Sequence, residues 1–172
     1  GGLTIPGIES VDPQQFIEEF LGPALARLKL TFATPDQYHD WWRRHPALAG
    51  SDVRDDDLVA YADHDLTGEA PNLRSSVSEP SVHGDATELP EMGTAAHQLT
   101  VPANLLSAPR GLLNDPNPMQ PQGVARAWAA GAPTQRRASV VPNVNHYTIV
   151  MGAAGAAVVA RAIEAALRQA TQ

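Results

Sequence analysis

The sequence predicts an α/β fold preceded by a helical segment, and two observations carry this prediction. Residues 99–106 and 138–141 are short apolar runs, and each is followed by a loop and then by a helical pattern. This order of strand, loop and helix, repeated once, is typical of a parallel sheet flanked by helices. Before residue 98 the chain shows short helical patterns separated by proline and glycine, without one convincing strand. We therefore expect a boundary near residue 98.

The helical segment carries recognisable start signals. Asp12-Pro13 and Thr34-Pro35 each place a side-chain acceptor at the N-cap and proline at the first helical position. Gly22-Pro23 predicts a break inside the first of these helices, because proline removes a backbone donor and clashes with the preceding turn. The predicted helices span residues 12–30, 34–45, 52–65 and 78–89.

The α/β part is expected to gather function in two loops. One loop, residues 107–121, follows the first predicted strand, and a shorter one, residues 142–147, follows the second. The carboxyl ends of parallel strands meet at one edge of a sheet, so we expect these two loops to lie close together. Residues 124–130 and 153–168 are the helices predicted after the first loop and after the second.

Composition excludes several classes of partner and site. The net charge is −7 and the only lysine is Lys29, so nucleic acid is not an expected partner. There is no cysteine, which excludes disulfides, thiolate metal sites and a cysteine nucleophile, and which suits a cytoplasmic location. No run of about 18 apolar residues occurs, so no membrane span is expected. The first residues lack the features of a signal peptide and an initiator Met, and we expect the chain to begin inside a longer protein.

Asp115 and His146 are the candidate catalytic residues, one in each loop. A carboxylate that accepts a hydrogen bond from imidazole Nδ1 fixes the tautomer and stabilises the imidazolium, as in the acid–histidine part of a catalytic triad. The other interpretation is that Asp115 is a turn residue within Asn-Asp-Pro-Asn and that His146 is an ordinary polar loop residue. Spacing alone favours this second interpretation.

Three stretches of the sequence resemble the closing segments of the α/β-hydrolases: residues 101–106 (VPANLL), 111–115 (GLLND) and 141–147 (VPNVNHY). In that family the acid follows a V-P-x-x-L-L strand and a glycine, and the histidine follows a second strand in a V-x-x-x-x-H-aromatic loop. The resemblance implies that Asp115 is the acid and His146 the histidine of the triad. Residues 1–9 are then similar to the end of a core strand and linker, 10–97 to a helical lid, and 98–172 to the C-terminal part of the core.

The resemblance implies a serine hydrolase that cleaves an ester or related acyl bond of a small molecule, without a cofactor or a metal. No G-x-S-x-G nucleophile motif occurs in the sequence. In the family this motif precedes the acid and the histidine. We therefore expect the nucleophile in a missing N-terminal half of the same protein, and we expect the chain alone to be inactive.

Two alternatives stay open. A relative with the same fold uses an aspartate nucleophile on alkyl halides or epoxides, and that residue would also lie outside this chain. The chain could instead belong to a non-catalytic binding or interaction module derived from the hydrolase fold. An intact acid and histidine argue against this second alternative.

Aromatic residues are the candidates for a substrate pocket. Tyr38, Trp41 and Trp42 lie in one predicted helix, and Tyr147 directly follows the candidate histidine. Aromatic side chains supply much contact area to a substrate, but packing of the lid onto the body is the favoured role of the helical three. Asp63-His64-Asp65 has metal-ligand residue types, yet adjacent helical residues do not face one point, so we expect a solvated face there.

Overall fold

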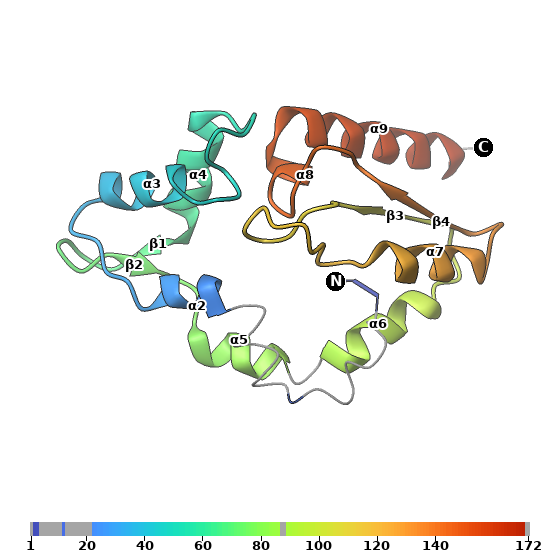
Figure 1. Ribbon diagram of the computed structural model, residues 1–172, viewed down its shortest axis with the longest axis horizontal. Helices are drawn as coiled ribbons and strands as arrows, with labels where there is room; N and C mark the ends of the chain where they lie inside the picture. Colours follow the sequence, from blue (N-terminus) through green and yellow to red (C-terminus); the bar gives the residue numbers. More distant parts are fainter. Residues whose placement is uncertain (1, 4–11, 13–21, 87–88, 171–172) are drawn as a thin grey trace.

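The computed structural model describes residues 2–3, 12, 22–86 and 89–170, and its elements form a helical part and an α/β part (Figure 1). No helix in these ranges combines the length and the apolar character needed to cross a membrane. In chain order the elements are α2 (Gly22–Leu28), α3 (Pro35–Arg43), α4 (Asp55–Asp65), β1 (Leu66–Thr67), β2 (Arg74–Ser75), α5 (Glu79–Ala86), α6 (Leu89–His97), β3 (Ala103–Ser107), α7 (Gln122–Ala130), β4 (Arg136–Val140), α8 (Thr148–Met151) and α9 (Ala153–Ala170).

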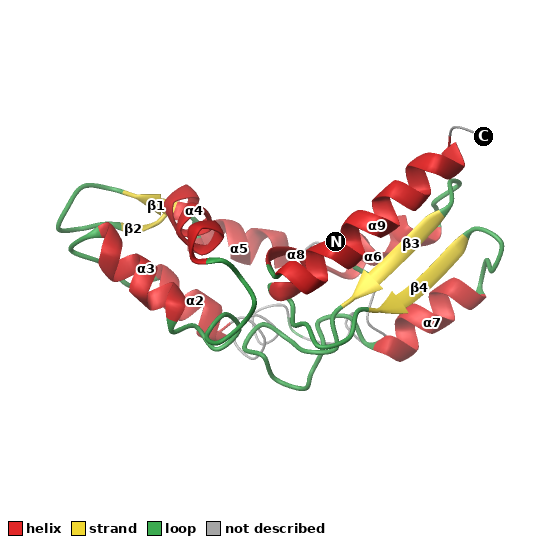
Figure 2. Cartoon of the chain, turned by 90° about the horizontal axis from the view of Figure 1, so that it is seen from above, coloured by secondary structure: helices red, strands yellow, loops and turns green. Residues whose placement is uncertain are grey.

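The α/β part consists of the parallel pair β3 and β4 between two helices. The strands pair from Ala103 with Arg136 to Ser107 with Val140, which confirms the predicted parallel arrangement. Helix α9 covers one face of the pair and α7 the other (Figures 1 and 2). Leu3, Ala125 and Trp128 form the buried core on the α7 side. Trp128 also ties α6 to this core, because its Nε1–H donates to the Ala96 carbonyl at 3.0 Å.

The helical part has its own aromatic core. Helix α3 begins as predicted, with the Thr34 side chain accepting from the Gln37 N–H at 3.3 Å and Pro35 at the first helical position. Its apolar face packs on α4 and on the hairpin formed by β1 and β2. The buried residues of this core are Phe32, Tyr38, Trp42, Leu48, Leu58, Ala62 and Leu73.

The structure corrects the expectation that no strand precedes residue 98. Strands β1 and β2 form a short antiparallel hairpin, extended by a bridge between Phe32 and Leu73. Two-residue strands are too short to produce an alternating pattern in the sequence. Helices α6 and α8 were not predicted either, and β3 begins later than expected, after Pro102, which cannot donate to a strand ladder. Residues 13–21 of the first predicted helix lie outside the described residues.

Two of the hydrogen bonds among the described residues join the loop between α3 and α4 to the α/β part. The Asn145 side-chain amide donates to the Ala47 carbonyl at 2.7 Å. The Asp52 carboxylate accepts from the Ala154 N–H at 2.8 Å, at the start of α9. Ring contacts add to them, since Tyr147 packs against Trp42 and His45 with centroid distances of 6.0 and 5.4 Å.

Candidate active site

The loops that follow β3 and β4 lie side by side, as the parallel arrangement predicts. The Val141 N–H donates to the Ser107 carbonyl at 2.9 Å, directly beyond the paired strands. Further along, Arg110 and Asn145 form an isolated parallel bridge. The two loops therefore stay paired beyond the ends of the strands, up to the residues that flank the candidate acid and histidine.

Asp115 is held inside a tight loop. Its carboxylate accepts from the Asn117 N–H at 2.9 Å and, over a longer 3.4 Å, from the Leu113 N–H. Its carbonyl accepts from the Gly111 N–H at 3.0 Å. A Cβ atom at Gly111 would lie 2.7 Å from Asp115 Oδ2 and 2.5 Å from the Asn117 carbonyl oxygen, so glycine is the residue that lets this loop close around the carboxylate.

His146 follows a capped helix start. The Asn145 side-chain oxygen accepts from the N–H groups of Tyr147 and Thr148, each at 3.0 Å. In return Thr148 Oγ1 accepts from the Asn145 N–H at 2.8 Å. This reciprocal pair has the hydrogen-bond pattern of a capping box, and it fixes the turn of His146 and Tyr147 that leads into α8. His146 is exposed, yet neighbouring groups desolvate its ring enough to lower its pKa below the ordinary value of 6.5.

The structure brings the neighbours of Asp115 and His146 into contact. Asn145 Nδ2 donates to Asn114 Oδ1 at 3.2 Å, and these two asparagines directly precede the candidate histidine and acid. Asn114 has a φ of 63°, a left-handed conformation that asparagine tolerates better than most residues. Among the described residues, no hydrogen bond or ion pair joins Asp115 to His146 itself, so their pairing stays a prediction.

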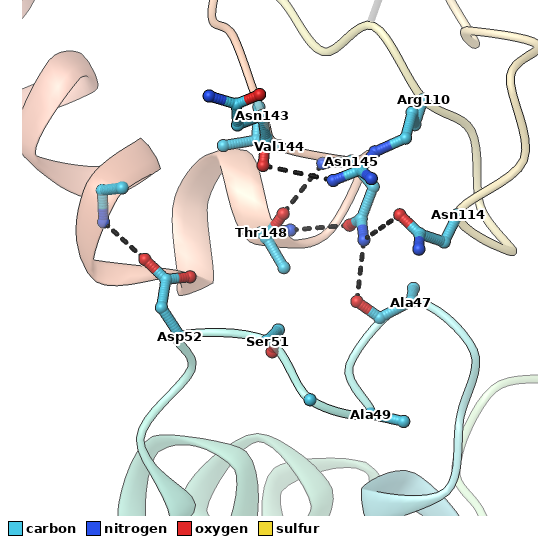
Figure 3. A pocket seen from close by; sticks show the side chains of 12 residues that line it. Ala47, Ala49, Ser51, Asp52, Arg110, Asn114, Asn143, Val144, Asn145 and Thr148 are labelled. Atoms are coloured by element: carbon cyan, nitrogen blue, oxygen red, sulfur yellow. Dashed lines mark hydrogen bonds between the residues drawn. The ribbon is translucent and has the colours of Figure 1, made fainter.

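A polar pocket of about 320 Å³ opens between the helical part and the two loops (Figure 3). The loop between α3 and α4 forms one wall, and the loops after β3 and β4 form the other. Helix α9 contributes the remaining wall through Ala154. The pocket is lined by Ala47, Ala49, Gly50, Ser51, Asp52, Arg110, Asn114, Asn143, Val144, Asn145, Thr148 and Ala154. Asp115 and His146 do not line this pocket, although the residues before them do.

The predicted aromatic pocket residues are not among those that line this cavity. Tyr38 and Trp42 are 0% and 1% exposed, so in this structure they serve the core of the helical part rather than an open pocket. Trp41 is half-buried beside Trp42, with ring centroids 5.0 Å apart. Tyr147 is half-buried and packs on Trp42 and His45. Of the three helical aromatic residues, Trp42 contacts Tyr147 of the α/β part, and a substrate-binding role of the four residues stays a prediction.

The Asp63-His64-Asp65 stretch is not wholly a solvated face. His64 is exposed. The Asp63 carboxylate contacts His39, with 2.7 Å between Asp63 Oδ1 and His39 Nε2. Asp65 turns inward, where it pairs with Arg27 and accepts hydrogen bonds from Tyr38 and Ser75. Within the residues that the structure describes, no three side chains of metal-ligand type come together.

Sequence reasoning included Gly111 in the motif before Asp115 but missed Asn145, a second residue that shapes this site. The signal for Asn145 was present in the N-x-x-T spacing of residues 145–148, which is the spacing of a capping box. It was overlooked because the following helix, α8, has only four residues and shows no apolar periodicity.

No family model and no curated protein matches the sequence. Among solved structures, the chain is similar to the crystal structure of E-2-(acetamidomethylene)succinate hydrolase, with a TM-score of 0.67 and 14% sequence identity. The match covers 90% of this chain and 53% of that one, so the chain spans about half the length of this hydrolase. At this identity the likeness concerns the fold. Over the matched residues, the fold of this chain is therefore similar to the fold of that hydrolase.

Proposed function

We propose that the protein carrying this chain is a serine-type hydrolase that cleaves an ester or related acyl bond in a small molecule. The observation that carries the proposal is the placement of Asp115 and His146 after two paired parallel strands, with Asn114 and Asn145 hydrogen bonded at 3.2 Å. The similar solved structure is that of a hydrolase, which favours hydrolysis over a purely binding role.

His146 would act first as the general base towards the nucleophile and then as the general acid towards the leaving group. Asp115 would orient the ring and stabilise the imidazolium. The 3.4 Å contact from the Leu113 N–H is the weaker of the two bonds to this carboxylate, which leaves Oδ2 able to accept from His146 Nδ1 instead. The residues around 10–97 would act as a lid that restricts water at the site.

The nucleophile is not among these 172 residues, because no G-x-S-x-G motif occurs. We propose that another segment of the same protein supplies it. A serine at that position distinguishes this proposal from the aspartate chemistry of the dehalogenases and epoxide hydrolases. Labelling of the whole protein by a fluorophosphonate probe supports serine, and the absence of labelling in a protein that hydrolyses esters supports aspartate.

The test replaces the proposed base in the protein at its full natural length. His146→Ala is expected to lower turnover of short p-nitrophenyl esters by about 10³- to 10⁴-fold, since removing one triad member disables the others. Asp115→Asn should act in the same direction, because the ring loses its orienting acceptor. The matched control is His64→Ala, an exposed histidine of α4, which should leave turnover unchanged. If His146→Ala keeps activity within threefold of the wild type, the proposal fails.

The lowered pKa of His146 also places the acid limb of the pH profile. A general base works in its neutral form, and desolvation by neighbouring groups keeps this exposed ring neutral to lower pH than an ordinary histidine. We therefore expect the acid limb of kcat/KM to lie below pH 6.5.

A further inference from the structure

The Asn145 side chain uses its complete hydrogen-bonding capacity. Its amide nitrogen donates to the Ala47 carbonyl at 2.7 Å and to Asn114 Oδ1 at 3.2 Å. Its amide oxygen accepts from the N–H groups of Tyr147 and Thr148, both at 3.0 Å. A primary amide offers two donors and two acceptor sites, and all four are occupied here. The residue is 2% exposed, so water cannot replace these partners.

These four bonds reach three segments around the candidate histidine (Figure 3). The bond to Ala47 reaches the loop between α3 and α4 in the helical part. The bond to Asn114 reaches the residue before Asp115. The two accepted bonds set the turn that begins with His146.

We infer that Asn145 is a positioning residue for His146, which sets where the imidazole lies relative to Asp115 and links that position to the helical part. This inference rests on the proposed function. The site needs one side chain that accepts from the turn at His146 and also donates to Ala47 and Asn114, and an uncharged amide of this length does both. Aspartate would keep the acceptors and lose both donors, whereas serine would keep a good N-cap acceptor and lose the reach to Ala47 and Asn114.

The position of His146 decides catalysis because proton transfer needs the imidazole within hydrogen-bond reach of the nucleophile. A misplacement of about 1 Å at a catalytic group can cost about 100-fold in rate. A residue that served the fold alone would change stability without changing the environment of the His146 ring. The test therefore measures that ring directly.

The experiment compares wild type, Asn145→Ser and the control Asn72→Ser in the full natural protein with ¹³C-labelled histidine. Asn72 is exposed in the helical part, and its side chain makes no bond to the site. The His146 ring signals are assigned with His146→Ala. We expect Asn145→Ser to shift the His146 ring signals and titration midpoint and to lower kcat by about 10- to 100-fold with KM within threefold. Asn72→Ser should match the wild type in all of these.

Unchanged His146 signals and kcat in Asn145→Ser overturn the inference, even where His146→Ala abolishes activity and the proposed function stands. If His146→Ala stays active, the proposed function fails, and the ring signals alone decide whether Asn145 positions this side chain. Should Asn145→Ser not fold, Asn145→Asp serves instead, because it keeps the cap and the size of the side chain. For this variant we compare the change in kcat with the change in KM, because the added charge by itself shifts the titration midpoint of His146.

Discussion

At the scale of single residues, Gly111 has the most demanding surroundings near the site. The loop from Gly111 to Asn117 turns around the Asp115 carboxylate, and it leaves no room for a side chain at its first residue. A Cβ atom there would approach backbone and carboxylate atoms at 2.5 and 2.7 Å, closer than real Cβ contacts occur. The loop must therefore open for any other residue at this position, and Asp115 must move with it.

Gly111→Ala should accordingly destabilise the protein by about 1–3 kcal/mol, the usual cost of forcing extra atoms into a closely packed site. Urea unfolding measures this change. The matched control is Gly123→Ala in α7, where a Cβ atom would meet nothing within 4 Å and where alanine favours the helix by about 0.5–1 kcal/mol. Equal stabilities of the two variants would contradict this explanation of Gly111.

His45 is a buried titratable residue of the helical part. Burial and the nearby Arg27 charge lower its pKa below the ordinary 6.5. Its Nδ1 accepts from the Ala47 N–H at 3.3 Å, a bond that requires an unprotonated nitrogen. Both observations mean that the folded state holds His45 neutral, whereas the unfolded chain takes up a proton near pH 6.5.

The free energy of unfolding should therefore fall as pH drops below 6.5, until the folded-state pKa is passed. Each unit by which the folded pKa is lowered contributes about 1.4 kcal/mol to this loss. His45→Phe keeps a ring against Trp42 and Tyr147 but cannot titrate. Its free energy of unfolding should therefore fall less between pH 7 and pH 5 than that of the wild type. Urea titrations of His45→Phe and of the wild type at both pH values check this difference.

At the scale of elements, a polar cluster holds α2, α3, α4 and β2 together. Arg27 of α2 pairs with Asp65 of α4, donates to the Tyr38 hydroxyl at 2.6 Å and lies 5.1 Å from the Trp42 ring centre. Ser75 of β2 donates to the same carboxylate at 2.8 Å. Burial and the bond to Asp65 raise the pKa of Tyr38 to about 12. Burial alone would raise the pKa of Asp65, but the bonds from Tyr38 and Ser75 and the Arg27 charge lower it.

Arg27→Met should destabilise the protein by about 3 kcal/mol, because it leaves the Asp65 charge in a site where that side chain is 12% exposed. The double variant with Asp65→Asn should recover part of this loss, since the unpaired charge is then gone. Lys29→Met is the control: its pair with Glu79 is exposed and should contribute less than about 1 kcal/mol. Unfolding in urea ranks the three variants, and an additive double variant would contradict the coupling.

Prediction from the sequence succeeded where an element has a repeated physical signal. Thr34-Pro35 marked the start of α3, and the predicted apolar runs at residues 99–106 and 138–141 overlap the parallel strands β3 and β4. It failed for β1 and β2, whose two residues each carry no periodicity and whose pairing depends on the packing of Phe32 and Leu73. The inward turn of Asp65 was missed for a related reason: its partner Arg27 lies in another helix.

At the scale of the whole molecule, the order β3, α7, β4 and α9 was predictable, and the contacts between the helical part and the α/β part were not. The loops after β3 and β4 were expected at one edge of the sheet because parallel strands dictate it. The pocket between these loops and residues 47–52 depends on how the helical part docks, and no local pattern encodes that. Asn145 takes part in both kinds of contact: its bond from the Thr148 N–H is local in the sequence, and its bond to the Ala47 carbonyl is not.

The bonds from Asn145 to Ala47 and from Ala154 to Asp52 span 98 and 102 residues of sequence. Both must close large loops, whose entropy is lost before the contacts form, so docking of the two parts belongs to the late, slow stage of folding. Once formed, the contacts couple the two parts. Separating them would leave the buried Asn145 amide without the Ala47 carbonyl and the Ala154 N–H, at the start of α9, without the Asp52 carboxylate. Unfolding of the helical part and of the His146 loop should therefore proceed as one cooperative event.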